Sequence, residues 1–277
     1  MGRALAESAA RAGFDTLLTT RSGAGSTTPL DVTRWGQVKE VVGQVRPQVI
    51  FNCAALTNVD GCENNSEMAR AVNRDGAAHL LEMATAVGAR LVQVSTDYVF
   101  DGRNGPYLEE DPTSPLGIYG QTKLAAEELI GEEGGHLIVR ANVLFSHAGG
   151  SQASFVTWVA KSLAAGESIR VVTDQVGNPT YAPHLADALV LAVQKGADGL
   201  YHYGGLEFAS RFSFAKTIAR ILNLDETLIE PVSTQALGQI APRPLHSGLI
   251  CSRMKMDLGV KNFNLNDALQ AAFEGVN

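Results

Sequence analysis

Short apolar runs alternate with helical segments along the first half of this chain, and this alternation constrains the fold more than any other feature. The apolar runs are continuous, as is typical of strands covered on both faces of a sheet, and they lie at 49–53, 91–94 and 137–139. Segments with helical spacing separate them, at 33–45, 66–87 and 119–133. This order predicts an α/β fold with a Rossmann-like, doubly wound parallel sheet.

Loops and shorter strands become more frequent after about residue 145. We therefore expect a dinucleotide-binding domain over residues 1–145 and a smaller, C-terminal substrate-binding domain over 146–277. The strand and helix patterns at about 174–204 predict that this stretch returns to the first domain, so that the two are interleaved.

Charge and composition exclude several classes of protein. Acidic residues outnumber basic ones, 29 to 22, and a net charge of −7 repels phosphate backbones, so no nucleic-acid partner is expected. No apolar run approaches the ~20 residues of a membrane span, and the first residues lack the apolar core of a signal peptide, so we expect no membrane partner and a cytoplasmic location. The three cysteines, Cys53, Cys62 and Cys251, fit neither a disulfide scaffold nor a zinc spacing, and no metal is expected.

Tyr119 and Lys123 are the first candidates for chemistry. They stand four residues apart in a helical segment and therefore share a helix face. A lysine ammonium beside a phenol favours the phenolate and lowers the pKa of the tyrosine toward physiological pH, so the tyrosine could exchange a proton with a carbonyl or alcohol oxygen. On this motif alone, a surface tyrosine and a solvated lysine are an equal alternative.

The segment Ser95-Thr96-Asp97 changes that balance, because it follows an apolar run and so lies at the carboxyl end of a strand. Open α/β sheets bind their ligands at this edge. Thr96 could donate its hydroxyl to the same substrate oxygen as Tyr119. A hydroxyl donor after one strand and a Tyr-x-x-x-Lys at the start of the next helix form a specific combination.

On these motifs the chain resembles the extended short-chain dehydrogenase/reductase family, and within it the dTDP-4-dehydrorhamnose reductase group. The resembling segments run nearly the full length, at 52–60, 95–102, 119–124, 174–180, 199–202 and 243–244. The resemblance implies Tyr119 as the general acid, Lys123 on the nicotinamide ribose and Thr96 orienting the carbonyl. It also implies hydride transfer from a nicotinamide to a keto group of a sugar nucleotide, a small-molecule partner.

The start of the chain departs from that family, whose members open with a strand and a glycine-rich turn. Residues 1–12 here have helical spacing instead, Gly13 ends them, and a short strand is expected at 16–20. Gly2 corresponds to the last glycine of the turn, which lets the helix pack closely on the sheet. Because a central strand supplies much of the ~5–15 kcal/mol stability of a typical protein, we expect the natural chain to start upstream of Met1. A degraded gene and a true variant with a remodelled site are the alternatives.

The expected cofactor-binding residues are Gly2, Arg21, Asp31, Val32, Ala54, Ala55 and Lys123. Arg21 follows the second-strand position and suits the 2′-phosphate of NADPH, although a solvated arginine explains it as well and NADH is possible. Asp31 and Val32 resemble the family's contact to the adenine, with a helix-capping aspartate as the alternative. Ala54 and Ala55 are small side chains after a strand, which allow close approach of the cofactor or simply tight packing.

The expected substrate residues are Asp97, Asn142, Val143, Gln175 and Arg243. The resemblance weakens among them. Val143 stands where rhamnose-forming reductases carry a tryptophan, and His246 replaces an asparagine of the late Arg-Pro motif. These changes leave the hydride chemistry in place and the sugar open.

The combined prediction is an oxidoreductase, an NADPH-dependent reductase of a nucleotide-linked 4-keto-6-deoxy sugar. A related epimerase or dehydratase is less favoured, because Ser95 and Asp97 supply no obvious acid–base pair beside Thr96. A non-catalytic regulatory subunit resembling that of methionine adenosyltransferase is a further alternative, since that subunit also resembles this group. A homodimer is expected only by analogy with the family.

Overall fold

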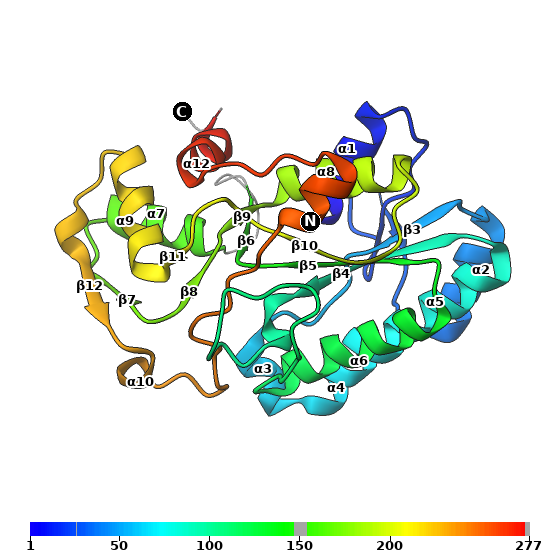
Figure 1. Cartoon of the computed structure of the whole chain (residues 1–277), viewed down its shortest axis with the longest axis horizontal. Coiled ribbons are helices and arrows are strands. Elements are labelled where there is room, and N and C mark those ends of the chain that lie inside the picture. Colours follow the sequence, from blue (N-terminus) through cyan, green and yellow to red (C-terminus); the bar gives the residue numbers. More distant parts are fainter. Residues whose placement is uncertain (26, 147–153, 275–277) are drawn as a thin grey trace.

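The computed structural model describes residues 1–25, 27–146 and 154–274, and its chain forms two lobes (Figure 1). A four-stranded sheet with the order β10-β5-β4-β3 lies at the centre of the larger lobe. All neighbouring strands in it run parallel. Its members are β3 (Val49–Asn52), β4 (Arg90–Thr96), β5 (Leu137–Ala141) and β10 (Gly199–Tyr203).

Helices cover both faces of this sheet, so the doubly wound α/β prediction is confirmed (Figure 1). One face carries α1 (Gly2–Arg11), α8 (Ala182–Gln194) and α11 (Ser252–Leu258). The other carries α2 (Trp35–Val45), α5 (Gly76–Val87) and α6 (Ile118–Glu133), with the short α3 (Val59–Asn64) and α4 (Ser66–Arg70) beside them.

The side-chain alternation of a strand builds the two cores of this lobe. On β4, Val92 and Val94 join the cluster under α1 and α8. Leu91 points the other way and joins the cluster of α2 and α5. Each large apolar side chain buried in this way stabilises the fold by ~1.5–3 kcal/mol.

A π-helical turn, η1 (Ala71–Asp75), interrupts the helix expected at 66–87 and separates α4 from α5. Its buried Asn73 accepts a hydrogen bond from the Leu56 backbone N–H (2.7 Å) and donates one to the Thr122 hydroxyl (3.1 Å). The widened turn therefore ties the loop after β3 to α6, and through α6 to the predicted catalytic residues.

The first strands stand apart from the central sheet. β1 (Thr19–Thr20) and β2 (Thr28–Pro29) pair in parallel with each other. Within the residues that the structure describes, no ladder joins β1 to β3. The strand expected at 16–20 is confirmed only in its last two residues, because only these find a strand partner.

The smaller lobe has a core of its own, in which Phe145 and Phe214 are fully buried. Two short β-ladders connect this lobe with the segments that lead to and from the large lobe. They pair β6 (Leu144–Phe145) with β9 (Thr180–Tyr181), and β8 (Val176–Gly177) with β11 (Ala209–Ser210). Its other elements are α7 (Phe155–Ala164), β7 (Ile169–Val172), α9 (Arg211–Ile221), β12 (Ile229–Val232), α10 (Thr234–Leu237) and α12 (Leu265–Phe273).

The chain returns twice to the large lobe. α8 and β10 complete one face and one edge of the sheet, and α11 then packs against β10. This second return lies outside 174–204, the range expected from the sequence. Among the described residues, no helix has the length and apolar character needed to cross a membrane.

Candidate active site

Thr96, Tyr119 and Lys123 meet where β4 ends and α6 begins. Thr96 is the last residue of β4, and Tyr119 and Lys123 lie in the first two turns of α6. The Thr96 hydroxyl donates to the Asp97 carboxylate (3.1 Å) and lies close enough to the Tyr119 phenol to lower its pKa in part. The ring of Tyr98 packs edge-on against Tyr119 with centroids 5.4 Å apart. The structure therefore places a phenol and a hydroxyl side by side at the carboxyl edge of the sheet, as the motifs predict.

Glycine at position 120 makes this meeting of helix and strand end possible. A Cβ there would lie 2.1 Å from the Tyr98 carbonyl oxygen and 2.9 Å from the Pro115 Cβ. Only a residue without a side chain lets the first turn of α6 approach the 3₁₀ turn that follows Thr96 so closely. Gly120 thereby sets the distance between Tyr119 and Thr96.

The charge state of the phenol differs from the expectation. Burial raises the pKa of Tyr119 above its usual value, and the nearby charge of Asp97 raises it further. The Lys123 ammonium donates to the Val94 carbonyl oxygen (2.6 Å) and not to the phenol, and its charge does not outweigh the effect of burial on the Tyr119 pKa. The expected lowering of the Tyr119 pKa by Lys123 is therefore wrong for this structure, and the phenol holds its proton at neutral pH.

A pocket opens beside this pair, between the two lobes. It is lined by Asp97, Tyr98, Val143, Gln175, Val176, Gly177, Arg211, Pro244 and Ser247. Asp97 is buried and accepts a hydrogen bond from the Ser247 hydroxyl. Burial raises the pKa of Asp97 to about 6. Three of the expected substrate residues, Asp97, Val143 and Gln175, thus line one cavity.

The other two expected substrate residues, Asn142 and Arg243, lie behind the residues that line the pocket. Asn142 is fully buried and donates to the Ser247 carbonyl oxygen (2.9 Å), so it reaches a ligand only through Ser247. Arg243 donates to Asp60 (3.0 Å), and its Nη1 is buried without a hydrogen-bond partner among the described residues. Contact of Asn142 with a substrate is therefore not supported by its placement.

Val143 and Gln175 hold their places in different ways. Val143 has φ +45°, a left-handed conformation that costs a β-branched residue on the order of 1–3 kcal/mol. The Gln175 amide donates to Thr234 (2.9 Å) and Gln239 (2.7 Å), which fixes its carbonyl end at the pocket. A strained residue at the pocket wall is typical of functional sites.

Arg211 and Ser247 were not singled out from the sequence. Arg211 begins α9, capped by the Ser210 hydroxyl, and its guanidinium lies over the Phe155 ring at 5.5 Å. Burial lowers the pKa of the Arg211 guanidinium, while the nearby Tyr98 and Asp97 side chains favour its charged form. The late Arg-Pro motif contains Ser247, but no periodicity or spacing marks Arg211, because its place depends on how the lobes meet.

The expected cofactor residues follow the ends of β1, β2 and β3. Arg21 is exposed just after β1, and Ala54 and Ala55 are half-buried after β3. Asp31 accepts hydrogen bonds from the Thr33 N–H (3.0 Å) and hydroxyl (2.7 Å), which lowers its pKa. The helix cap lies further on, at Arg34, so Asp31 stabilises a turn and does not cap α2. The side chain of Val32 is buried in the α2–α5 core.

The start of α1 lies close to this edge. Its terminal amino group and Lys123 both act on the Cys53 thiol at the end of β3. The first turn of α1 carries no acidic residue and no side-chain cap, so its backbone N–H groups and helix dipole suit a phosphate. This observation fits a dinucleotide. Gly2 is not required for close packing, since a Cβ there would meet only Leu18 at 3.8 Å, an ordinary contact.

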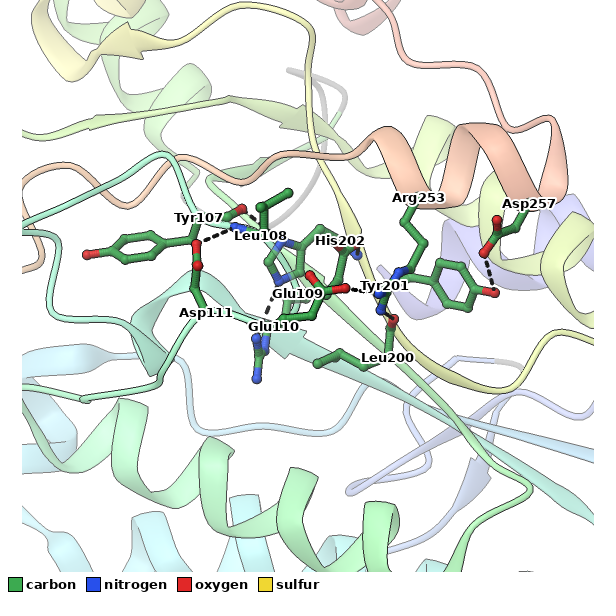
Figure 2. Close-up of polar contacts among 11 residues, drawn as sticks. Tyr107, Leu108, Glu109, Glu110, Asp111, Leu200, Tyr201, His202, Arg253 and Asp257 are labelled. Atoms are coloured by element: carbon green, nitrogen blue, oxygen red, sulfur yellow. Dashed lines mark hydrogen bonds and ion pairs between the residues drawn. The ribbon is translucent and has the colours of Figure 1, made fainter.

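The loop between Thr96 and α6 is clamped onto β10 (Figure 2). The backbone N–H of His202 donates to Glu109 (2.9 Å), and the His202 ring bonds the Tyr107 carbonyl oxygen (3.2 Å). From α11, Arg253 reaches Glu110. These contacts hold the segment that leads into Tyr119, so His202 has a structural role here.

Comparison with known proteins identifies relatives along the whole chain. The family described as RmlD substrate binding domain matches residues 1–277. The dTDP-4-dehydrorhamnose reductase of Mycobacterium tuberculosis is 38% identical over 256 residues, which cover 90% of this chain and 81% of that protein. A dTDP-4-dehydrorhamnose reductase from Bacillus anthracis, solved with NADP, superposes with a TM-score of 0.82 at 33% identity, over 87% of this chain and 85% of that one. A Clostridium acetobutylicum dTDP-4-dehydrorhamnose reductase, RfbD ortholog, superposes with a TM-score of 0.90 at 29% identity, over 98% and 94%.

The Rossmann-like sheet, the Tyr-x-x-x-Lys helix and the relatives together define an oxidoreductase of the extended short-chain dehydrogenase/reductase class. Within that class, the chain belongs to the RmlD substrate binding domain family.

Proposed function

We propose that this protein is an NADPH-dependent reductase of a nucleotide-linked 4-keto-6-deoxy sugar. The observation that carries the proposal is the placement of the protonated Tyr119 phenol near the Thr96 hydroxyl at the carboxyl end of β4, next to Asp97 and Tyr98, which line the inter-lobe pocket. The relatives support it, since several are named dTDP-4-dehydrorhamnose reductase and one was solved with NADP.

Tyr119 acts as the general acid in this proposal. Its raised pKa keeps the proton on the phenol while a ketone binds. When bound, the reduced nicotinamide supplies the hydride. The carbonyl oxygen then gains negative charge and becomes a stronger base than the phenolate, so it takes the Tyr119 proton. Thr96 donates a second hydrogen bond to the same oxygen and orients it.

Lys123, the start of α1 and the small Ala54 and Ala55 would hold the dinucleotide. Lys123 would turn from the Val94 carbonyl oxygen to the nicotinamide ribose. The α1 N–H groups would bind the diphosphate. The exposed Arg21 would bind a 2′-phosphate, which favours NADPH over NADH.

Two measurements test the proposal. An NADPH fluorescence titration of the chain asks whether the cofactor site is formed, and reduction of dTDP-4-keto-6-deoxy sugars asks whether it turns over. Tyr119→Phe should lower kcat at least ~10²-fold. Tyr201→Phe is the matched control, because the one hydrogen bond of its hydroxyl among the described residues is to Asp257 (3.3 Å), on the far side of β10 (Figure 2).

The outcomes separate the alternatives. NADPH binding with turnover that depends on Tyr119 supports the reductase. Binding without turnover of any sugar nucleotide, together with co-purification of a synthetase, supports the non-catalytic regulatory subunit instead. Near-normal turnover of Tyr119→Phe refutes the acid role.

A further inference from the structure

The face of α6 that carries the catalytic pair continues one turn further, to Glu127. Tyr119, Lys123 and Glu127 are spaced by four residues and lie in line along the helix. Only 3% of Lys123 and 5% of Glu127 are exposed. A charge buried to this degree needs partners close by.

The sheet supplies the partners of Glu127. Ser95 on β4, Arg140 on β5 and His202 on β10 stand in register across three strands. The Ser95 hydroxyl donates to Glu127. Arg140 donates from Nη2 (2.7 Å) and from Nε (3.1 Å to each oxygen), so two side chains of the sheet fix both carboxylate oxygens.

His202 holds Arg140 from the opposite side. Burial and the Arg140 charge lower the pKa of His202 to about 3, so the ring is neutral. Its Nδ1–H can then donate to the Tyr107 carbonyl oxygen, while Nε2 accepts from Arg140 Nη1 (3.4 Å). The guanidinium also lies over the Phe100 ring at 5.0 Å. Arg140 therefore cannot leave Glu127 without disrupting its contacts with His202 and Phe100, which lie beneath the loop between Thr96 and α6.

Few ionisable groups act on Lys123. Glu127 on the same helix and Cys53 at the end of β3 both act electrostatically on Lys123. The Met1 amino group also acts on Cys53. Arg140 lies on β5 beyond Glu127 and is paired with it, while β4 offers only the uncharged Ser95 and the Val94 carbonyl oxygen. Among the described residues, Glu127 is thus the carboxylate whose field supports the Lys123 ammonium.

We propose that Glu127, fixed by Arg140 and Ser95, is a positioning residue that keeps Lys123 charged and aligned with the cofactor edge of the sheet. The assignment rests on the proposed function for its purpose, since Lys123 would bind the nicotinamide ribose. Burial lowers the pKa of Lys123 to about 8 even though Glu127 opposes that shift. Without Glu127, a large share of the protein would carry a neutral Lys123 at physiological pH.

The test measures Lys123 directly and needs neither cofactor nor substrate. The ammonium nitrogen is followed against pH by NMR in protein labelled with ¹⁵N-lysine, and Lys123→Met assigns its signal. Glu127→Gln combined with Arg140→Met removes the buried pair without leaving an unpaired charge, a change that is often neutral for stability. Arg140→Met alone keeps Glu127 and removes the opposing charge. Glu128→Gln, an exposed neighbour on the same helix, is the matched control.

We expect opposite shifts from the two variants. The double variant should lower the titration midpoint of Lys123 by about one pH unit, and Arg140→Met alone should raise it by a similar amount. Glu128→Gln should leave it unchanged. If Arg140→Met does not fold, because it leaves Glu127 buried and unpaired, the downward shift in the double variant still tests the inference. An unmoved midpoint in the folded variants overturns the inference, whereas a shift without any sugar reduction would count against the proposed substrate alone.

Discussion

Replacing Gly120 by alanine should move Tyr119, the proposed general acid, away from Thr96. The new Cβ would stand 2.1 Å from the Tyr98 carbonyl oxygen, whereas real Cβ contacts stay beyond 3.0 Å, so α6 must retreat by about 0.9 Å. Tyr98 O is a backbone atom and Pro115 Cβ belongs to a rigid proline ring, so neither neighbour can swing away. A displacement of about 1 Å at a reacting group costs on the order of 10²-fold in rate. We therefore expect kcat for ketone reduction to fall ~10²-fold.

Stability should respond less than rate. Overpacking costs ~1–3 kcal/mol, and the better helix propensity of alanine returns ~1 kcal/mol of it. Gly131→Ala on the same helix is the control, because its Cβ meets nothing within 4 Å. That variant should gain ~0.5–1 kcal/mol in urea unfolding and keep wild-type kcat. If Gly120→Ala keeps kcat within twofold of wild type, the close approach of α6 does not position Tyr119, and the reasoning is refuted.

Three further outcomes are expected. The pKa of Asp97 is about 6 in the folded protein against 3.8 for a free aspartate, so between these pH values the native state binds more protons than the unfolded state and the free energy of unfolding falls as pH rises from about 4 to 6. Asp97→Asn should flatten that part of a urea-unfolding pH series, and an unchanged slope would contradict the raised pKa. Arg211→Gln should raise KM for the sugar nucleotide about tenfold and leave NADPH affinity unchanged in a fluorescence titration, whereas an unchanged KM would remove Arg211 from the substrate site. Phe100→Ala should cost ~3–5 kcal/mol in the same unfolding assay, because its ring is fully buried between Tyr107 and His202, and a loss below ~1 kcal/mol would show that this core can collapse.

Local patterns in the sequence were sufficient to predict those features of the fold and the site that depend on the spacing of neighbouring residues. The helix over residues 2–11 and α6 follow from periodicity, and Thr96 follows from its place after an apolar run. Each of these features is encoded within at most 16 consecutive residues. The meeting of Thr96 with Tyr119 was also predictable, because parallel strands and the helices after them share one edge of the sheet.

Features that depend on distant contacts were not predictable. The π-helical turn at Asn73 exists because Leu56 and Thr122 offer partners, and no helix pattern encodes them. Arg211 reaches the pocket only through the way the lobes close. The proton affinity of Tyr119 was mispredicted, because burial and the engagement of Lys123 by a backbone carbonyl outweigh the sequence spacing of the pair.

The order in which the chain visits the two lobes has a consequence for its synthesis. The edge strand β10 ends at Tyr203, and α11, which packs on it, ends only at Leu258 of 277 residues. The large lobe therefore cannot close while its first half emerges from the ribosome, and the exposed edge of β5 must wait for most of the chain. Nascent protein is open to aggregation during that interval, so the yield of folded protein should depend on translation rate and on chaperones more than it would for two lobes encoded one after the other.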